Sequence, residues 1–335
     1  MEPLEGDFLE TVEGLIFDVK GVVHPHNAVI AYVRYVPHPT GKRVRGGRTY
    51  AKLYSLEDRE AFLRRNYPQY LRPDPVFNET VQAVPLDRIA RYYKPSEKLR
   101  EMLFASKLDA VERAALELAT LIRREAGIGL DSIGVTGSIL VGLHSESSDI
   151  DLVVVGEQSA RKAYEALRSL IAEGGSVRPY DAAGLRRLYE FRSKDTPLPF
   201  RAFAEMERKK VLQGLFKGRD FYVRLVKRSE EYGERYGDKV YLPLGVQKVR
   251  AKVVDATDSI FTPCRYVVSE VEVLEGLRRA RIREIVSLRG RFCELAGEGE
   301  HIIARGKLEL VRCRSGESYY RLFLGRKGDY MLTLD

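Results

Sequence analysis

The sequence predicts an α+β fold, in which a central mixed sheet with helices is flanked by a β-rich N-terminal segment and a C-terminal antiparallel β-domain. Residues 1–55 carry apolar, β-branched runs separated by turns, the middle alternates short strands with helices, and the pattern after residue 246 is mostly β. A length of 335 residues suits two or three domains. We therefore expect three parts, at 1–104, 105–245 and 246–335.

The N-terminal part is expected to open with strands. Leu15–Phe17 and Ala28–Val36 are apolar and β-branched, and a turn at 24–27 separates them. The basic run 42–48 follows a second turn and is expected to be flexible. Residues 56–104 are expected to be helical and irregular, because prolines interrupt them repeatedly. The sequence assigns no role to this part.

The middle part begins with the clearest helix of the chain. Over 107–126 apolar residues recur at spacings of three and four, and Gly127 ends the pattern. The elements expected next are a strand at 132–135, a Gly137-Ser138 turn, a short helical piece at 139–144, a strand at Ile150–Val155, helices at 158–173, 182–192 and 201–215, and a strand at Arg219–Val226. This order is typical of a small α/β core.

The C-terminal part is expected to be a separate antiparallel β-domain that closes into a small barrel. Its expected strands are Val249–Val254, Tyr266–Val273, Glu284–Leu288, His301–Ala304, Leu308–Val311 and Tyr319–Leu324. Cys264, Cys293 and Cys313 are odd in number, far apart and without a C-x-x-C pair, so we expect buried thiols rather than disulfides or a zinc site.

Composition narrows the class of protein. Hydrophobic residues make up 44% and charged residues 31%, which is typical of a globular chain. No apolar run reaches the roughly 18 residues of a membrane span, and the acidic N-terminus does not resemble a signal peptide. We expect a cytoplasmic protein with no membrane association and no obligate protein partner. A net charge of +8 favours a polyanionic partner, although abundant Arg, Lys and Glu without Trp also suit the ion-pair networks of a thermophile.

Two acids mark the candidate site. Asp149 and Asp151 lie two residues apart at the start of an expected strand, so their side chains share one face. Adjacent carboxylates repel and raise each other's pKa. A divalent cation relieves this repulsion, and Mg²⁺ prefers carboxylate and phosphate oxygens.

The Gly137-Ser138 turn, between a strand and a short helix, suits the same chemistry. Glycine lets a phosphate approach the backbone, and backbone N–H groups with the Ser138 hydroxyl can hold a triphosphate. A phosphate cradle beside a metal-binding acid pair predicts phosphoryl or nucleotidyl transfer, in which two metals activate the acceptor hydroxyl and stabilise pyrophosphate.

The pattern Gly137-Ser138, ten residues, then Asp149-Ile150-Asp151 resembles the signature of the DNA polymerase β nucleotidyltransferase superfamily, over about residues 107–227. The rest of the chain resembles an uncharacterised archaeal group of predicted nucleotidyltransferases. The resemblance implies that Asp149 and Asp151 bind two Mg²⁺ ions, with Mn²⁺ as an alternative, and that Gly137 and Ser138 hold the triphosphate of an NTP such as ATP. The competing interpretation of the acid pair is a helix or turn cap.

The family also needs a third carboxylate on a neighbouring strand, to bind metal and deprotonate the acceptor. Asp220, which opens the strand Arg219–Val226, is the candidate, and a turn residue is an equally weighted alternative. Asp255 and Glu205 are the reserves. Ser148, with Ser145 and Ser147, either helps to position phosphates or is an ordinary polar turn residue.

Two basic clusters indicate nucleic acid, because Arg and Lys recognise phosphates. The clusters are Arg208, Lys209, Lys210, Lys217, Arg219, Arg224, Lys227 and Arg228, and then Arg278, Arg279, Arg281, Arg283, Arg289 and Arg291. The alternative is an ion-paired surface. The first hypothesis is therefore an enzyme that transfers NMP from an NTP to a hydroxyl of RNA. The alternatives are transfer to a small molecule or a protein, and a non-catalytic nucleic-acid-binding protein that retains the fold.

Overall fold

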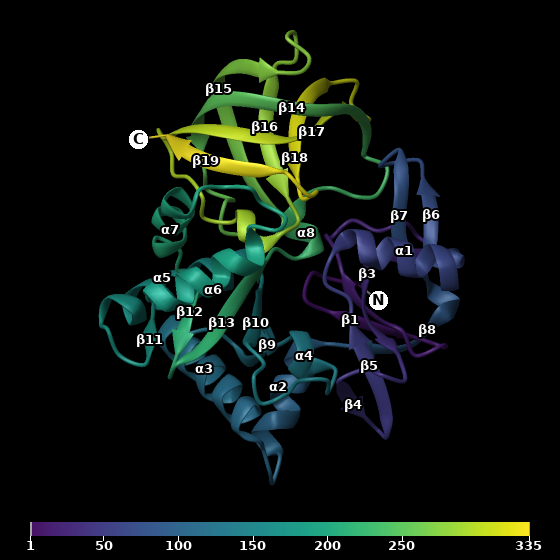
Figure 1. Ribbon diagram of the computed structural model, residues 1–335, viewed down its shortest axis with the longest axis vertical. Helices are drawn as coiled ribbons and strands as arrows, with labels where there is room; N and C mark the ends of the chain where they lie inside the picture. The colour runs from purple at the N-terminus through teal and green to yellow at the C-terminus, as the bar shows by residue number, and fades with distance from the viewer. Residues whose placement is uncertain (1, 335) are drawn as a thin grey trace. The chain divides into compact units, whose positions relative to one another are not determined.

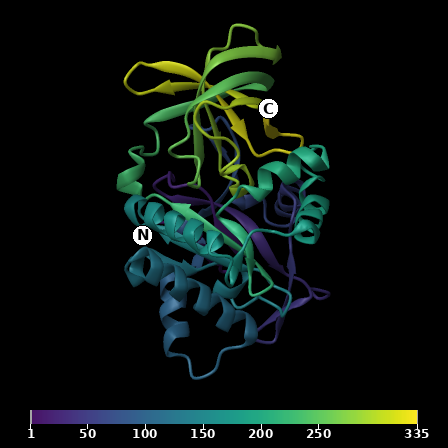
Figure 2. The same ribbon diagram turned by 90° about the vertical axis from the view of Figure 1, so that its left-hand side faces the viewer.

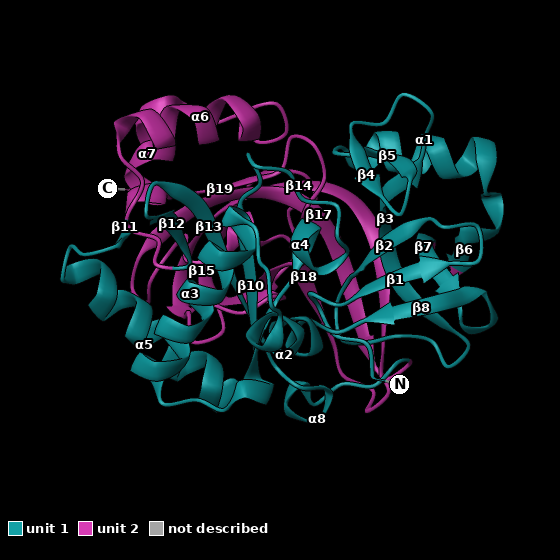
Figure 3. Ribbon diagram, turned by 90° about the horizontal axis from the view of Figure 1, so that it is seen from below, with its two compact units in different colours: residues 1–73, 80–178, 212–236 teal, residues 74–79, 179–211, 237–335 magenta. Residues whose placement is uncertain are grey.

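The computed structural model describes residues 2–334. The chain forms two compact units: unit 1 comprises residues 1–73, 80–178 and 212–236, and unit 2 comprises residues 74–79, 179–211 and 237–335 (Figure 3). Unit 1 therefore unites the N-terminal strands with most of the expected middle part. The three-part division expected from the sequence, at 1–104, 105–245 and 246–335, stays a prediction.

The first sheet of unit 1 is antiparallel, with the order β4-β5-β3-β2-β1-β8, and β7 pairs with β3 and β6. Its strands are β1 Phe8–Thr11, β2 Ile16–Val19, β3 Ala28–Pro37, β4 Arg43–Arg45, β5 Arg48–Lys52, β6 Leu71–Asp74, β7 Glu79–Pro85 and β8 Ile89–Tyr93. Alternating apolar residues place Phe17 and Val33 in its core, where they pack with Leu63 of helix α1 (Leu56–Asn66). The strands predicted at Leu15–Phe17 and Ala28–Val36 are confirmed.

Two expectations for this region need correction. The basic run 42–48, expected to be flexible, forms the β4–β5 hairpin, and the positive φ angles of Gly46 and Gly47 make the tight turn. The stretch 56–104 contains the helices α1 and α2 (Pro95–Phe104), as expected, but the strands β6, β7 and β8 between them were not expected. Pro68 begins a 3-10 turn, Pro85 ends β7 and Pro95 begins α2, where a missing N–H is tolerated.

The second sheet of unit 1 is mixed, with the order β11-β12-β13-β10-β9. Its elements are α3 Ala110–Ala126, β9 Ile133–Val135, α4 Gly137–Leu140, β10 Ile150–Val155, α5 Glu157–Ala172, β11 Val177–Arg178, β12 Gln213–Phe216, β13 Arg219–Val226 and α8 Ser229–Tyr232. Strands β10 and β13 run parallel, and the other pairs are antiparallel. The mixed sheet with helices that the sequence predicts is confirmed.

The two faces of this sheet differ in chemistry. Ile150, Leu152 and Val154 of β10 are buried on the face covered by α3 and α5, which lie side by side in Figures 1 and 2. Helix α3 begins with a capping box between Asp109 and Glu112, which satisfies its first N–H groups. The alternate residues of β10, beginning with Asp151, point to the opposite face.

Unit 2 contains helices α6 (Ala182–Arg192) and α7 (Phe200–Arg208) and a β-barrel. The strands are β14 Lys239–Asp255, β15 Cys264–Glu275, β16 Ile282–Ser287, β17 His301–Cys313, β18 Ser318–Leu324 and β19 Tyr330–Leu334. Because β14 pairs with both β15 and β17, the series β14-β15-β16-β18-β17 closes on itself, and β19 extends β17. The expected barrel is present. This is the strand order of the OB-fold barrel.

Three expected details are corrected, two in the barrel and one in the segment before it. It is not wholly antiparallel, since β16 and β18 run parallel. The strands expected at His301–Ala304 and Leu308–Val311 are one strand, β17. The helix expected over 201–215 ends at Arg208, and Gln213 already begins β12.

Cys264 and Cys293 are buried and Cys313 is half-buried, all as free thiols. Among the described residues, no helix is long and apolar enough to span a bilayer.

Candidate active site

Gly137 and Asp151 pack directly against each other at the centre of the candidate site. The N–H of Thr136 donates to the carbonyl of Asp151 at 2.9 Å, so the end of β9 holds the turn against β10. Gly137 has a φ of +66°, and a Cβ built on it would stand 2.2 Å from Oδ2 of Asp151. Only glycine satisfies both conditions. The buried Ser138 follows, and its carbonyl accepts the N–H of Leu143 at 2.9 Å.

The acid pair lies where β10 begins. Asp149 is exposed and Asp151 is half-buried. Burial, and next the charge of Asp149, raise the pKa of Asp151 to about 7, although Lys52, Arg224 and Arg34 act in the opposite direction. The repulsion expected from the sequence is therefore present, and a cation bound between the two carboxylates would relieve it.

Asp220 lies on the strand next to the acid pair. In the parallel β10–β13 register, Ile150 is opposite Phe221 and Asp151 is opposite Tyr222. Asp220 precedes Phe221 as Asp149 precedes Ile150, so the two acids stand at the same level and on the same face. The reserve acids belong to unit 2, where Glu205 accepts from Arg201 at 3.0 Å and Asp255 accepts the N–H of Thr257 at 2.8 Å.

Two arginines brace the loop between α4 and β10. Arg43 of β4 donates to the carbonyl of Leu143 and to the hydroxyls of Ser145 and Ser148 at 2.9–3.1 Å. Arg219 of β13 donates to the carbonyls of Glu146 and Ser148 at 2.7 Å. Ser148 is buried, and its hydroxyl also accepts the N–H of Ser145 at 2.9 Å. This hydroxyl therefore orders the loop, and its contact with a nucleotide stays a prediction.

The N-terminal sheet contributes cations that the sequence analysis missed. Arg34 of β3 and Lys52 of β5 interact electrostatically with Asp151, and Lys52 also does so with Asp149. The β3–β5 register pairs Tyr35 with Lys52. The basic residues of β5, the second strand of the β4–β5 hairpin, were a usable signal of a phosphate-binding surface. Only long-range sheet pairing, however, brings Arg34 and Lys52 to the acids.

A buried network of charged side chains lies close to Asp151. Arg224 of β13 donates to Glu5 at 2.7 Å, and Lys20 contacts Glu5 at 3.3 Å and Asp18 at 2.7 Å. Arg224 was counted among the cations for nucleic acid. That assignment is wrong, because its guanidinium is committed to an internal ion pair that joins β13 to the N-terminal segment.

Most of the other basic residues that were predicted to contact nucleic acid also bond to groups within the protein. Lys210 contacts Glu207 at 2.9 Å, Lys217 contacts Glu117 at 2.7 Å and Lys227 contacts Glu157 at 3.4 Å. Arg283 pairs with Glu317 at 2.6 Å, and Arg289 and Arg291 approach Asp195 at 3.1 and 3.5 Å. The exposed arginines Arg278, Arg279 and Arg281 have no ion pair among the described residues. The ion-paired interpretation therefore holds for much of both clusters.

A separate cluster with metal-ligating side chains joins α3 to the loop after α4. One ligand atom from each of Asp109, Glu112 and His144 lies within 4.8 Å of the others. Asp109 is the cap of α3 and accepts the N–H groups of Val111 and Glu112, while His144 Nε2 lies 2.7 Å from its Oδ2. These contacts lower the pKa of Asp109, against the effect of burial. The cluster has a structural explanation without a metal.

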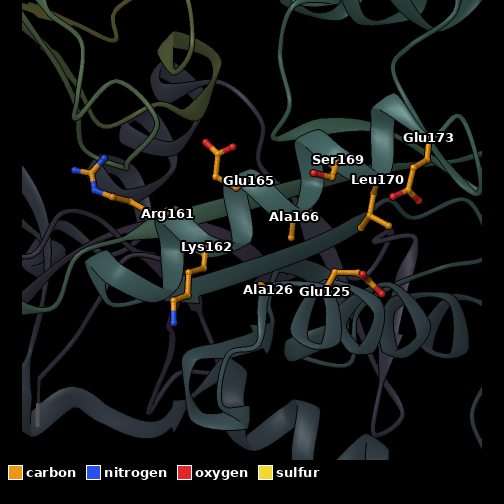
Figure 4. A pocket seen from close by; sticks show the side chains of 9 residues that line it. All are labelled: Glu125, Ala126, Arg161, Lys162, Glu165, Ala166, Ser169, Leu170 and Glu173. Carbon is orange, nitrogen blue, oxygen red and sulfur yellow. The ribbon is translucent and has the colours of Figure 1, made fainter.

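A hollow of about 540 Å³ lies between α3 and α5, and Figure 4 shows the side chains that line it. Glu125, Glu165 and Glu173 alternate there with Arg161 and Lys162. These helices cover the apolar face of the mixed sheet, so the hollow is on the side away from Asp149 and Asp151. Its mixed charges are those of a solvated helix groove.

Comparisons with known proteins agree with this geometry. The sequence profile described as nucleotidyltransferase domain matches residues 116–212, which include the turn and the acid pair. The chain belongs to the nucleotidyltransferases of the DNA polymerase β type. MJ1086 of Methanocaldococcus jannaschii, a protein described as uncharacterised, is 32% identical over 327 residues, which cover 95% of this chain and 94% of the relative. No solved structure matches the chain.

Proposed function

We propose that this protein transfers a nucleoside monophosphate from an NTP to an acceptor hydroxyl, with RNA as the acceptor and divalent metal as the cofactor. The observation that carries the proposal is the placement of Asp149, Asp151 and Asp220 on one face of adjacent parallel strands, with Gly137 packed against Asp151. Three carboxylates and a side-chain-free turn in one place suit the joint binding of metal and polyphosphate.

The donor set fits Mg²⁺, because it consists of carboxylate oxygens, which are hard ligands. A bound cation would also relieve the repulsion from Asp149, which together with burial raises the pKa of Asp151 to about 7. Asp149, Asp151 and Asp220 would hold two ions, with Mn²⁺ as a substitute. When bound, these ions would neutralise the phosphates and lower the pKa of the acceptor hydroxyl.

The remaining steps fall to this chain's own residues. Gly137 and Ser138 bind the triphosphate, and the bracing by Arg43 and Arg219 fixes the loop that carries Asp149. Asp220 takes the proton of the acceptor hydroxyl, whose oxygen forms a bond to the α-phosphorus while the bond from that phosphorus to the bridging oxygen of pyrophosphate breaks. The products are the nucleotidylated acceptor and pyrophosphate.

Two features of unit 2 support RNA as the acceptor. The barrel has OB-fold strand order, and many barrels of this type bind single-stranded nucleic acid, an argument from fold analogy. The exposed Arg278, Arg279 and Arg281 in the β15–β16 connection are available to phosphates. A small-molecule or protein acceptor, and a binding protein without catalysis, are the alternatives.

The experiment that tests the proposal is incubation of the full chain with Mg²⁺, each labelled NTP in turn and one acceptor class: total RNA, protein or small-molecule extract. We expect label in RNA, lost on Asp149→Ala but retained in Asp131→Ala, which changes an exposed acid of the 3-10 turn before β9. Label in protein or small products would replace the acceptor class. RNA binding unaffected by Asp149→Ala, with no labelling in any fraction, would support the non-catalytic alternative.

A further inference from the structure

The N-terminal sheet is joined firmly to the catalytic motif. Arg43 bonds to the loop before β10, Arg45 donates to the carbonyl of Val141 at 3.2 Å, and the hydroxyl of Thr136 donates to the carbonyl of Gly6 at 2.5 Å. The β4–β5 hairpin lies beside α4 in Figure 1. The sheet is therefore a fixed wall of the site, although the matched nucleotidyltransferase profile begins only at residue 116.

Two cations of this wall differ from their neighbours. Lys20, Arg43, Arg45 and Arg224 all bond to protein acceptors. Arg34 and Lys52 form no ion pair with any described residue, and their side chains contact aromatic rings: Arg34 lies over Tyr54, and Lys52 over Tyr54 and Tyr35. They are held by stacking while their charges remain available to a ligand.

The position of these cations identifies the kind of ligand. Lys52 pairs across β3–β5 with Tyr35, next to Arg34, and Tyr35 is buried against the turn and loop that precede β10. Both cations therefore lie on the side of the sheet that faces the catalytic motif, and both interact with Asp151 without forming an ion pair with it. Once divalent cations bind the carboxylates, the negative charge of Asp149 and Asp151 no longer compensates Arg34 and Lys52, which then require an anion. Burial, and next the charge of Arg34, lower the pKa of Lys52 to about 8.

We propose that Arg34 and Lys52, supplied by the N-terminal sheet, bind the β- and γ-phosphates of the incoming NTP together with Gly137 and Ser138. This inference rests on the proposed function for its substrate, and it gives residues 1–104 a role in nucleotide binding. Arg offers a planar fork to phosphate oxygens and Lys offers a compact charge, a combination suited to a flexible polyphosphate.

The test is calorimetric titration of the full chain with inorganic tripolyphosphate in Mg²⁺, followed by NTP and NMP. Arg34→Ala and Lys52→Met are each expected to weaken tripolyphosphate and NTP binding about tenfold, and the double variant about a hundredfold. NMP binding should not change, since NMP lacks the contacted phosphates. Arg65→Ala, an exposed arginine of α1, is the matched control, and Arg34→Lys and Lys52→Arg should recover part of the affinity.

Other outcomes separate this inference from the proposed function. Unchanged tripolyphosphate affinity in folded Arg34→Ala and Lys52→Met overturns the inference. The two cations would then bind the acceptor or balance the charge of the acids instead. Labelling that depends on Asp149 would still sustain the proposed function in that case. Weakened tripolyphosphate binding without nucleotide transfer to any acceptor would sustain the phosphate site and reject the transferase. Thermal melting of each variant excludes loss of folding as the cause.

Discussion

Asp151 occupies the space that a side chain at Gly137 would need, because a Cβ at position 137 would stand 2.2 Å from the Asp151 Oδ2 atom. The contact couples the phosphate-binding turn to the metal-binding acid pair. Any displacement of the turn moves the carboxylate, and any displacement of the carboxylate opens the turn. The two halves of the sequence signature, with ten residues between Ser138 and Asp149, thus form one structural unit.

Replacing Gly137 with alanine should therefore abolish turnover. The Cβ displaces the Asp151 carboxylate, and its positive φ adds about 1 kcal/mol of strain. Gly142→Ala is the matched control, because Gly142 has a φ of +65° but its Cβ would meet the Arg45 side chain at ordinary contact distances of 3.5 and 3.8 Å. Labelling assays and urea melts of both variants separate the effects. Equal losses of activity in the two variants would show that backbone strain, not contact with Asp151, is responsible.

The three acids should be individually essential. Asp149→Asn, Asp151→Asn and Asp220→Asn are each expected to lower the rate of transfer by at least about 10²-fold, because each removes a charge that holds metal near the developing charge. Rates at saturating NTP and varied Mg²⁺ provide the measurement. Full activity of Asp220→Asn would eliminate Asp220 as the third carboxylate, and an intact rate in Glu157→Gln would serve as the surface control.

The pKa of Asp151 predicts how stability depends on pH in metal-free protein. Its value of about 7 lies above the ordinary 3.8, so the contribution of the protonated form is lost as pH rises through 7. Asp149 opposes ionisation, while Lys52, Arg34 and Arg224 favour it. Between pH 5 and pH 8 with EDTA, we expect the free energy of unfolding of the unaltered protein to fall by on the order of 2 kcal/mol because of Asp151. Asp151→Asn should lack this fall.

Asp7 provides the parallel case for that measurement. Burial raises its pKa to about 7 as well, so it contributes a similar loss in the same pH range. Asp7→Asn should remove its own share and leave that of Asp151. Urea denaturation at the two pH values gives the comparison. A pH dependence in Asp151→Asn identical to that of the unaltered protein would contradict the position assigned to this carboxyl.

The buried network should be costly to break. Glu5 has a fully buried side chain between Lys20 and Arg224. Glu5→Ala removes the ion-pair partner of the buried Arg224 and leaves Lys20 with Asp18 alone, so we expect a loss of about 3 kcal/mol in the free energy of unfolding. Glu60→Ala, which breaks the exposed pair with Arg64, should cost less than about 1 kcal/mol. Comparable losses for the two variants would show that the network carries no special weight.

RNA binding should depend on the three exposed arginines of the β15–β16 connection. Arg278, Arg279 and Arg281 changed together to alanine should weaken RNA binding at low salt and reduce the slope of log affinity against log salt by up to about 2. Arg113, Arg123 and Arg124 of α3, changed in the same way, provide a charge-matched control. If both triple variants bind RNA alike, the contact lies elsewhere or only net charge matters.

The sequence predicted the central part of this fold well because its signals are local. The apolar spacing before Gly127 predicted α3, and the runs Ile150–Val155 and Arg219–Val226 match β10 and β13. The hairpin at 42–48 was missed because a basic surface strand lacks hydrophobic alternation, and β4 and β5 depend on pairing with β3. Local pattern carries no information on such long-range pairing.

The candidate site divides in the same way. The acid pair and the turn could be recognised from spacing, since each lies within one short segment. Arg34 and Lys52 could not, because only the N-terminal sheet brings them to Asp151. Arg224 was assigned to the surface for the related reason that charge alone does not reveal burial, and Glu5, its partner, lies at the other end of the unit's sequence.

Nucleotidyl transfer by Asp149 and Asp151 is tested most directly by comparing NTP labelled at the α-phosphate with NTP labelled at the γ-phosphate, in Mg²⁺ with RNA. We expect that α-label enters RNA, that γ-label is released as pyrophosphate, and that both events cease in Asp151→Asn. Label transferred from the γ-position, or α-labelling that persists in Asp151→Asn, would contradict a nucleotidyltransferase site built on Asp149 and Asp151.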